Sequence, residues 1–304
     1  MFELVFLGTS ASAPSVQRGL PAQIIKHNEH RFLVDCGEGT QRQILQSGLG
    51  FRKLNRLLVT HGHLDHILGI GGLVSTYLRW EAIDKLDIYA GQNALERIDD
   101  LLFRVVIRGV KPPFPISLIP VTSGIIIEEK DFTIEAFPVN HRGPDCYGYL
   151  FQEASHRPFL AEKAEALGIP QGPWRRDLVQ GRPTTLPDGK VIQPEEVLGD
   201  FEPGTKLVSV GDTGDIESIL PYCKDADGLV IEGTYMVEEK EMAREFAHLT
   251  AQEAAKLAAM ANVGHLYLTH ISRRYRDKDV EKEAREVFPN TTIVHDFDQF
   301  TIKR

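Results

Sequence analysis

The sequence predicts a layered α/β protein in which sheets are covered by helices. The first observation is a series of short β-rich segments that suggest hairpins, at residues 4–7, 23–25, 32–34 and 57–59. The second is β–α alternation after residue 200, with strands expected at 207–210, 229–231 and 266–268 and helices near 238–247 and 251–261. The third is a length of 304 residues with 42% hydrophobic residues, which suffices for a substantial core.

The remaining elements follow in chain order. One helical pattern begins after His66, and another covers Asn93–Arg104. Two further strands are predicted at residues 125–127 and 132–139. The strands at 57–59 and 266–268 are both followed by Thr-His, so two halves of the chain end a buried strand in the same way.

Residues 152–199 differ from the sequence on either side. This stretch contains six prolines, several glycines and few apolar runs, which is typical of loops rather than of a core. A connection of that length inside a compact domain is usually functional or disordered. We therefore expect one domain spanning residues 1–304, with 152–199 as an inserted arm that leaves the sheet and returns to it.

Composition sets further limits. The formal net charge of −9 does not by itself indicate a nucleic-acid-binding protein, but arginines cluster locally and bound divalent metals would add positive charge. The three cysteines are widely spaced, which argues against a disulfide framework. The N-terminus does not resemble a signal peptide, and no segment is long and apolar enough to cross a membrane. We expect a cytoplasmic protein without membrane association.

The most informative segment is His61-Gly62-His63-Leu64-Asp65-His66. It places three imidazoles and a carboxylate within six residues, and zinc binds both kinds of group. In an extended loop His61 and His63 can face one metal, while Asp65 and His66 face a second. The alternative is a polar turn whose Asp65 merely caps a helix. Four ligand-type residues at this density favour a metal site.

Three more ligand-type residues follow predicted strands. His141 follows the strand at 132–139, Asp212 follows 207–210, and His270 follows 266–268. Because open α/β sheets gather their sites at the carboxyl ends of strands, these side chains can converge with the first cluster. Each alone would more often be structural, as a hydrogen-bonded histidine or a turn aspartate. Together the seven side chains are what two adjacent metals need when one ligand bridges them.

The His-x-His-x-Asp-His motif and the later ligands resemble the metallo-β-lactamase superfamily, which implies an αββα sandwich with a dinuclear site at one edge of the two sheets. Further motifs resemble the ribonuclease Z family of tRNA 3′-processing endoribonucleases and run from residue 4 to about residue 297. They are Phe6-Leu7-Gly8-Thr9-Ser10, Asp35-Cys36-Gly37-Glu38-Gly39-Thr40-Gln41, Gly211-Asp212-Thr213, Glu232-Gly233-Thr234, His248-Leu249-Thr250 and Leu268-Thr269-His270-Ile271-Ser272-x-Arg274-Tyr275. The last two are the most selective.

The resemblance implies roles for the site residues. One metal would take His61, His63 and His141, the other would take Asp65, His66 and His270, and Asp212 would bridge them. Two divalent ions per subunit are expected, preferably Zn²⁺, although Mn²⁺ and Fe²⁺ suit the same ligands. Asp65 would also orient or deprotonate the attacking water.

The leaving O3′ needs a proton that no metal ligand can donate. His248 is the expected general acid, with Glu232 as the carboxylate that orients it. The alternative for His248 is a histidine at a helix start, beside an N-cap at Thr250.

The resemblance also implies contacts with RNA. Members of the family carry a flexible arm with a Gly-Pro motif that grips the tRNA body, and Gly172-Pro173 matches it. Trp174, Arg175 and Arg176 beside this motif offer stacking and phosphate contact. Further substrate contacts are expected from the motif residues Arg18, Thr250 and Arg274.

Family members are typically dimers in which one subunit's arm serves the other subunit's site. Precursor tRNA and a second copy of the chain are therefore the expected partners. The alternative for the arm is a disordered linker.

The chain departs from the family near the expected RNA entrance. The loop at 14–19 ends in Arg18-Gly19 rather than Arg-Asn, and residues 69–74 read Gly-Ile-Gly-Gly-Leu-Val rather than Gly-Leu-Pro-Gly-Leu-Leu. Leu78-Arg79-Trp80 is also unlike the common bacterial pattern. These differences concern fine specificity and leave the metal chemistry intact.

The first functional prediction is a zinc-dependent endoribonuclease that cleaves precursor tRNA 3′ of the discriminator nucleotide, removes the 3′ trailer and leaves a tRNA 3′-hydroxyl. The alternative is a dinuclear-metal phosphodiesterase or arylsulfatase-like hydrolase of small esters on the same fold. A thioester or lactone hydrolase and a non-catalytic RNA-binding protein are further readings. The His248 motif and the arm favour the first, and the complete ligand set argues against the last.

Overall fold

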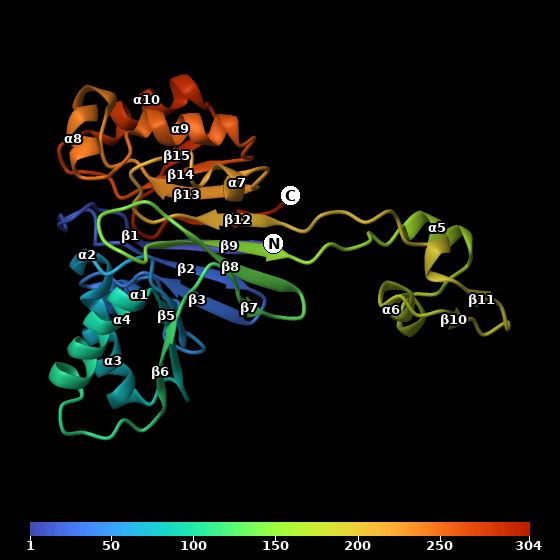
Figure 1. Ribbon diagram of the computed structural model, residues 1–304. Coiled ribbons are helices and arrows are strands. Elements are labelled where there is room, and N and C mark those ends of the chain that lie inside the picture. Colours follow the sequence, from blue (N-terminus) through green and yellow to red (C-terminus); the bar gives the residue numbers. More distant parts are fainter. The chain divides into compact units, whose positions relative to one another are not determined.

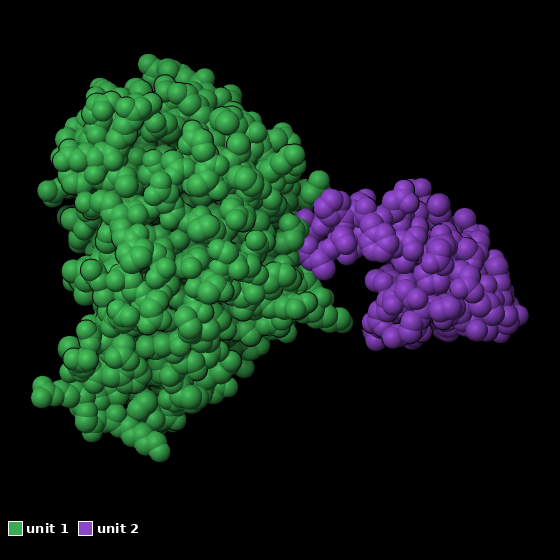
Figure 2. Space-filling model, viewed as in Figure 1, with its two compact units in different colours: residues 1–152, 205–304 green, residues 153–204 purple.

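The computed structural model describes residues 1–304, which divide into two compact units. Unit 1 consists of residues 1–152 and 205–304, and unit 2 of residues 153–204 (Figure 2). Each unit has apolar clusters of its own. No helix has the length and apolar character that crossing a membrane requires.

Unit 1 contains two sheets of seven strands each (Figure 1). The first sheet begins with antiparallel hairpins and continues as parallel strands from β3 to β6. Its strands in spatial order are β16 (Gln299–Ile302), β1 (Phe2–Gly8), β2 (Ala22–His27), β3 (His30–Val34), β4 (Arg56–Leu58), β5 (Leu86–Ala90) and β6 (Ile116–Pro120).

The second sheet is parallel from β12 through β13 and β14 to β15, and β9 pairs antiparallel with β12. Its strands in spatial order are β15 (Thr291–Ile293), β14 (Leu266–Thr269), β13 (Gly228–Glu232), β12 (Lys206–Ser209), β9 (Tyr147–Glu153), β8 (Phe132–Pro138) and β7 (Gly124–Glu128). The chain leaves this sheet at β9 and returns to it at β12.

Helices cover the outer face of each sheet (Figure 1). Those on the first sheet are α1 (Thr40–Gln46), α2 (Leu64–Ile67), α3 (Gly69–Trp80), α4 (Gln92–Asp99) and the π-helix η1 (Asp100–Val106). Those on the second sheet are α7 (Leu220–Cys223), the 3₁₀-helix η3 (Val237–Glu239), α8 (Lys240–Glu245), α9 (Ala251–Met260) and α10 (Asp277–Val287).

Three apolar layers hold unit 1 together. Successive side chains of a strand point to opposite faces, so Val5 and Leu7 of β1 pack toward α3, whereas Leu4 and Phe6 pack toward the second sheet. On the far side, alternate residues of β12 to β14 pack against the alanine-rich face of α9. The order helix, sheet, sheet, helix confirms the predicted αββα sandwich.

Unit 2 contains short elements around a small core. They are α5 (Ala161–Ala166), α6 (Pro173–Val179), β10 (Thr184–Thr185), β11 (Val191–Ile192) and the 3₁₀-helix η2 (Pro194–Glu196). Six buried side chains form the core: Ala164, Ile169, Leu178, Leu186, Ile192 and Val197. The expectation of loops without a core was therefore wrong for this stretch, because these apolar residues are spread singly between prolines and glycines and form no run.

Candidate metal centre

The candidate ligands lie where strands end and helices begin. His61 follows β4, His141 follows β8, Asp212 follows β12, and His270 follows β14. His63 is the N-cap residue of α2, and this helix places Asp65 and His66 in its single turn. The structure thus brings all seven predicted ligands to one edge of the two sheets.

The first ligand group consists of His61, His63, His141 and Asp212. One nitrogen or oxygen atom of each lies within 4.8 Å of the corresponding atoms of the others. The Nε2 atom of His61 is 2.8 Å from Nδ1 of His63, which is 3.3 Å from Nε2 of His141. These separations suit ligand atoms arranged around one ion, since zinc–nitrogen bonds are about 2.0–2.1 Å long.

The second group consists of Asp65, His66 and His270, with Asp212 beside it. Oδ2 of Asp65 lies 3.8 Å from Nε2 of His66 and 3.6 Å from Nε2 of His270. Asp212 faces both groups, because its Oδ2 is 3.7 Å from Nε2 of His61 and its Oδ1 is 3.5 Å from Nε2 of His270. A carboxylate in this position can bridge two metals.

Four imidazoles are held from behind through Nδ1. The partners are Thr60 Oγ1 for His61 at 3.0 Å, Asp35 Oδ2 for His66 at 2.8 Å, the Ala247 carbonyl for His141 at 2.8 Å and Thr234 Oγ1 for His270 at 2.8 Å. A hydrogen donated by Nδ1 fixes the ring orientation and leaves Nε2 as a lone-pair donor. All four rings therefore direct Nε2 into the cluster.

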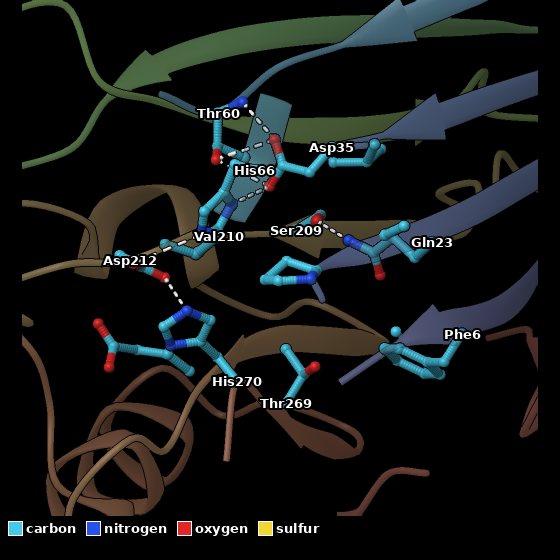
Figure 3. Close-up of a pocket in the computed structure, with 16 residues that line it drawn as sticks. Phe6, Gln23, Asp35, Thr60, His66, Ser209, Val210, Asp212, Thr269 and His270 are labelled. Carbon is cyan, nitrogen blue, oxygen red and sulfur yellow. Dashed lines mark hydrogen bonds and ion pairs between the residues drawn. The ribbon is translucent and has the colours of Figure 1, made fainter. Parts of the chain in front are cut away.

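Three buried atoms of the cluster have no hydrogen-bond partner: Nε2 of His66, Nε2 of His270 and Oδ1 of Asp212. Buried polar atoms are rarely left without partners, because the lost hydration is costly. Two of these atoms are shown facing each other in Figure 3, where Asp212 approaches His270. Five imidazoles and two carboxylates are also a donor set that divalent metals prefer, so the residues fit the implied ions.

The protonation states of most ligands suit metal binding; the exception is His66, because the Asp35 and Asp212 carboxylates outweigh burial and raise its pKa well above the usual range, so this imidazole must release a proton when a metal binds. Burial and the neighbouring imidazoles lower the pKa of His61, and burial together with His141 lowers the pKa of His63 to about 4. Burial opposes ionisation of Asp212, but His270 and His66 hold the pKa of that carboxyl well below its usual range. Neutral imidazoles and ionised carboxylates are the ligating forms.

A cavity of about 30 Å³ borders the second group between the two sheets. Its wall combines apolar and polar side chains, and the polar ones are paired: Gln23 donates to the Ser209 hydroxyl at 2.6 Å, and the Asp35 carboxylate accepts from the amide of Thr60 at 2.8 Å (Figure 3). The inner side of the cluster is therefore lined by groups with fixed orientations.

His248 lies beside the ligands, and one of its ring nitrogens is within 4.8 Å of ligand atoms of Asp212 and His270. Its Nδ1 faces both oxygens of Glu232, at 2.9 and 3.0 Å, and is 3.9 Å from Oδ2 of Asp212. Burial lowers the pKa of His248, but the Glu232 carboxylate outweighs this effect and raises the pKa to about 9. The Nε2 atom makes no hydrogen bond within the protein. The Glu232 carboxylate therefore favours the protonated form of the imidazole beside the cluster.

Sequence reasoning did not single out the residues behind the ligands. Asp35 appeared only within a motif, yet it holds His66 and Thr60. The signal was available, because Asp35 follows β3 just as the ligands follow their strands. Thr234 was likewise named only within a motif, and its hydroxyl contacts both Glu232 and His270.

Two of the predicted substrate contacts are buried. The guanidinium of Arg18 donates to Thr9 Oγ1 and to the Val294 carbonyl, each at 2.6 Å, and pairs with Asp277 at 3.0 Å. Thr250 is fully buried as the N-cap of α9, where its hydroxyl accepts from the amide of Glu253. Both side chains form hydrogen bonds within the protein that hold segments of the chain together, and neither faces the surface.

The departure at Gly19 has a local reason. A Cβ atom at this position would lie 3.2 Å from Nε2 of Gln43 and 3.3 Å from Oδ2 of Asp296. The amide of Gly19 also donates to that Asp296 oxygen at 2.6 Å. A larger residue would press on this contact, so glycine suits the chain's own neighbours.

The other predicted substrate residues differ in exposure. Arg274 is exposed and pairs with Glu239 at 3.0 Å. In unit 2, Pro173 begins α6 after Gly172, whose φ of 117° favours glycine. Trp174 packs against the core of unit 2, and Arg175 donates to the Ile169 carbonyl at 2.9 Å. Only Arg176 of this trio is exposed.

Comparisons with known proteins show which protein families the chain is related to. Residues 2–154 match the sequence family described as "Anti-Pycsar protein Apyc1" and belong to it. This match includes His61 to His66 and His141 but none of the ligands beyond residue 154. Ribonuclease Z of Bradyrhizobium diazoefficiens is 46% identical over 302 residues, which cover 99% of this chain and 100% of the relative.

Solved structures with lower identity share the fold. The metallo-β-lactamase fold protein YhfI of Bacillus subtilis superimposes with a TM-score of 0.69 at 18% identity, covering 98% of each chain. The short form of human tRNase Z gives a TM-score of 0.68 at 22% identity, covering 99% of this chain and 100% of that one. The chain has a metallo-β-lactamase fold and is 39–46% identical to ribonuclease Z proteins over nearly its whole length, so it belongs to the ribonuclease Z family.

Proposed function

We propose that this protein is an endoribonuclease that cleaves precursor tRNA on the 3′ side of the discriminator nucleotide. The cut removes the 3′ trailer and leaves a 3′-hydroxyl on the tRNA. The observation that supports this proposal most strongly is the His248–Glu232 pair beside the seven-ligand cluster, because the pair supplies the proton donor that a leaving O3′ requires. Family membership over the full length supports the same substrate.

Two divalent ions, when bound, supply an activated water and neutralise the charge of a phosphodiester. His61, His63 and His141 would hold one, Asp65, His66 and His270 would hold the other, and Asp212 would join both. We propose Zn²⁺, which five imidazoles favour over Mg²⁺ or Ca²⁺. Metal analysis of the purified protein tests this assignment, and manganese or iron at two ions per chain would overturn it.

The chain's own residues perform the remaining tasks. Asp65 has its Oδ2 fixed by the backbone amide of Ser12 at 3.1 Å, so it can orient a water at the second group. His248 holds a proton at Nε2, and Glu232 stabilises that charged form through Nδ1. Transfer of the Nε2 proton to the leaving O3′ leaves a neutral imidazole, and the proton that the attacking water loses balances this transfer and can restore the charged form.

A homodimer is the second part of the proposal. Exposed apolar side chains gather on neighbouring elements of the first sheet's helical layer: Leu64 of α2, Leu68 between α2 and α3, and Phe103 and Val105 of η1, which packs on α3. Monomers rarely expose clustered apolar side chains without a partner. Sedimentation equilibrium tests this part, and a monomer at micromolar concentration would contradict it. The cytoplasmic location stays a prediction of the sequence.

A comparison of substrates in parallel assays distinguishes the proposed tRNA substrate from the small esters of the alternative. Purified protein with Zn²⁺ receives a 3′-extended precursor tRNA and, in parallel, bis(p-nitrophenyl) phosphate and an aryl sulfate. We expect kcat/KM for the precursor to exceed that for either small ester by several orders of magnitude. A higher kcat/KM for a small ester would favour the dinuclear phosphodiesterase or arylsulfatase-like hydrolase.

A further inference from the structure

Arg142 stands at the rim of the site beside the proposed proton donor. It follows the ligand His141 directly and is exposed. Its guanidinium lies 5.2 Å from the centre of the Phe246 ring, and Phe246 is two residues before His248 in the loop between α8 and α9. The ring centres of His141 and His248 are 5.1 Å apart, so both chain segments meet at this rim.

The stacked guanidinium keeps all its hydrogen-bond donors. Arg142 forms no ion pair and no hydrogen bond within the protein. An aromatic ring covers one face of a guanidinium but leaves the N–H groups in its plane available. Phe246 thus holds the cation in place without neutralising it.

Other arginines over aromatic rings in this chain are already engaged. Arg56 over Phe32 pairs with Glu129 at 2.7 Å. Arg157 and Arg175 also lie over rings, and they donate to the carbonyls of Gly199 and Ile169. Arg142 is the member of this group that is free to bind an anion from outside.

The chemistry of the reaction indicates which anion. His248 marks the side of the leaving O3′, which belongs to the discriminator nucleotide, while the scissile phosphate stays with the trailer. Because Arg142 lies on the His248 side of the cluster, it faces the nucleotide before the cut. The phosphodiester nearest to that nucleotide, other than the scissile one, is the phosphate on its 5′ side.

We propose that Arg142, stacked on Phe246, binds the phosphate on the 5′ side of the discriminator nucleotide and so positions O3′ next to His248. The proposal rests on the proposed function and adds a substrate-positioning residue to it. Arginine suits this role because its planar N–H groups bind two oxygens of one phosphate at once.

The protein side of the test uses Arg142→Gln with Zn²⁺ and a precursor tRNA. A lost charge-assisted contact should lower kcat/KM by about 10- to 100-fold. The plot of log(kcat/KM) against log[salt] should become shallower by about one unit. Phe246→Leu should give a smaller loss of the same kind. The matched control is Arg52→Gln, an exposed arginine without an ion pair before β4, which should behave as the unaltered protein.

The substrate side of the test replaces the phosphate 5′ of the discriminator nucleotide by an uncharged methylphosphonate. The unaltered protein should lose as much activity as Arg142→Gln does, and the variant should show no further loss. With the methylphosphonate two nucleotides into the trailer, the variant should keep its full penalty. Additive losses at the 5′ phosphate, or an unchanged kcat/KM for Arg142→Gln, would overturn the proposal while leaving the cleavage reaction standing. If the unaltered protein did not cleave precursor tRNA, the proposed function would fail as well.

Discussion

At the scale of single residues, the cluster combines rigid imidazoles with unpaired ligand atoms. His66 is held by Asp35, and His270 is held by Thr234, so neither ring can turn to satisfy its own Nε2. Such partners behind the ligands orient them and raise their basicity. The buried atoms without partners are thus a consequence of how the surrounding residues fix each ring.

Asp212 is the most sensitive single position, because it alone faces both ligand groups. We expect Asp212→Ala to abolish cleavage and to reduce the amount of bound metal. Metal content by mass spectrometry and cleavage of precursor tRNA measure the two effects. Asp100→Ala, which removes an exposed carboxylate, is the control. Full activity of Asp212→Ala would refute the dinuclear assignment.

His248 should behave differently from the ligands. His248→Ala is expected to keep the bound metal and to lose about 10²- to 10⁴-fold in rate, the usual contribution of a general acid. Metal loss in this variant would mean that His248 is a ligand.

The same residue predicts a pH dependence. Glu232 raises the pKa of His248, so the proton is present at neutral pH and activity should fall as pH rises through that pKa. Glu232→Gln should move this fall to lower pH. An unchanged profile in Glu232→Gln would show that the pair does not set the alkaline limb of the pH profile.

At the scale of elements, the ends of strands could be predicted and the partners of the ligands could not. The apolar runs before His61 and His270 fix where β4 and β14 end, and strand ends converge at one edge. Nothing in the local sequence says that Ala247 offers its carbonyl to His141 across more than a hundred residues, because that contact depends on tertiary packing. For the same reason, burial of Arg18 was not visible in its motif.

The loop that contains His248 leads directly into helix α9, and the N-cap of α9 allows a prediction about stability. Thr250 and Glu253 form a capping box, so loss of the hydroxyl should cost about 0.5–2 kcal/mol of unfolding free energy. Thr250→Val removes the hydroxyl at constant size, and Thr250→Ser retains it. Urea unfolding should rank serine closer to the unaltered protein than valine. Unchanged stability of Thr250→Val with a raised KM would instead make Thr250 a substrate contact.

At the scale of the whole molecule, unit 2 enters and leaves through two paired strands. Gln152 of β9 lies opposite Lys206 of β12, and His156 bridges to Glu202. A short turn can therefore replace residues 155–203 without changing the ends it must join. The apolar spacing of unit 2 was too sparse to predict its core, whereas its prolines did predict a departure from the sheet.

Replacement of residues 155–203 by a two-residue Asn-Gly turn tests the arm. We expect unit 1 to fold, to bind metal and to hydrolyse bis(p-nitrophenyl) phosphate, since every candidate ligand lies outside unit 2. Cleavage of precursor tRNA should weaken through a raised KM. Equal losses on both substrates would mean that the segment is part of the catalytic core.

The central claim is that a two-metal cluster cuts precursor tRNA with His248 protonating the leaving O3′. The most direct measurement is incubation of the protein with an end-labelled, 3′-extended precursor tRNA, with and without chelator, and mapping of the cut at nucleotide resolution. The account predicts one cut after the discriminator nucleotide, a 3′-hydroxyl on the tRNA, a 5′-phosphate on the trailer, and no cut with chelator. A cut that persists with chelator, or a 2′,3′-cyclic phosphate on the tRNA, would contradict it.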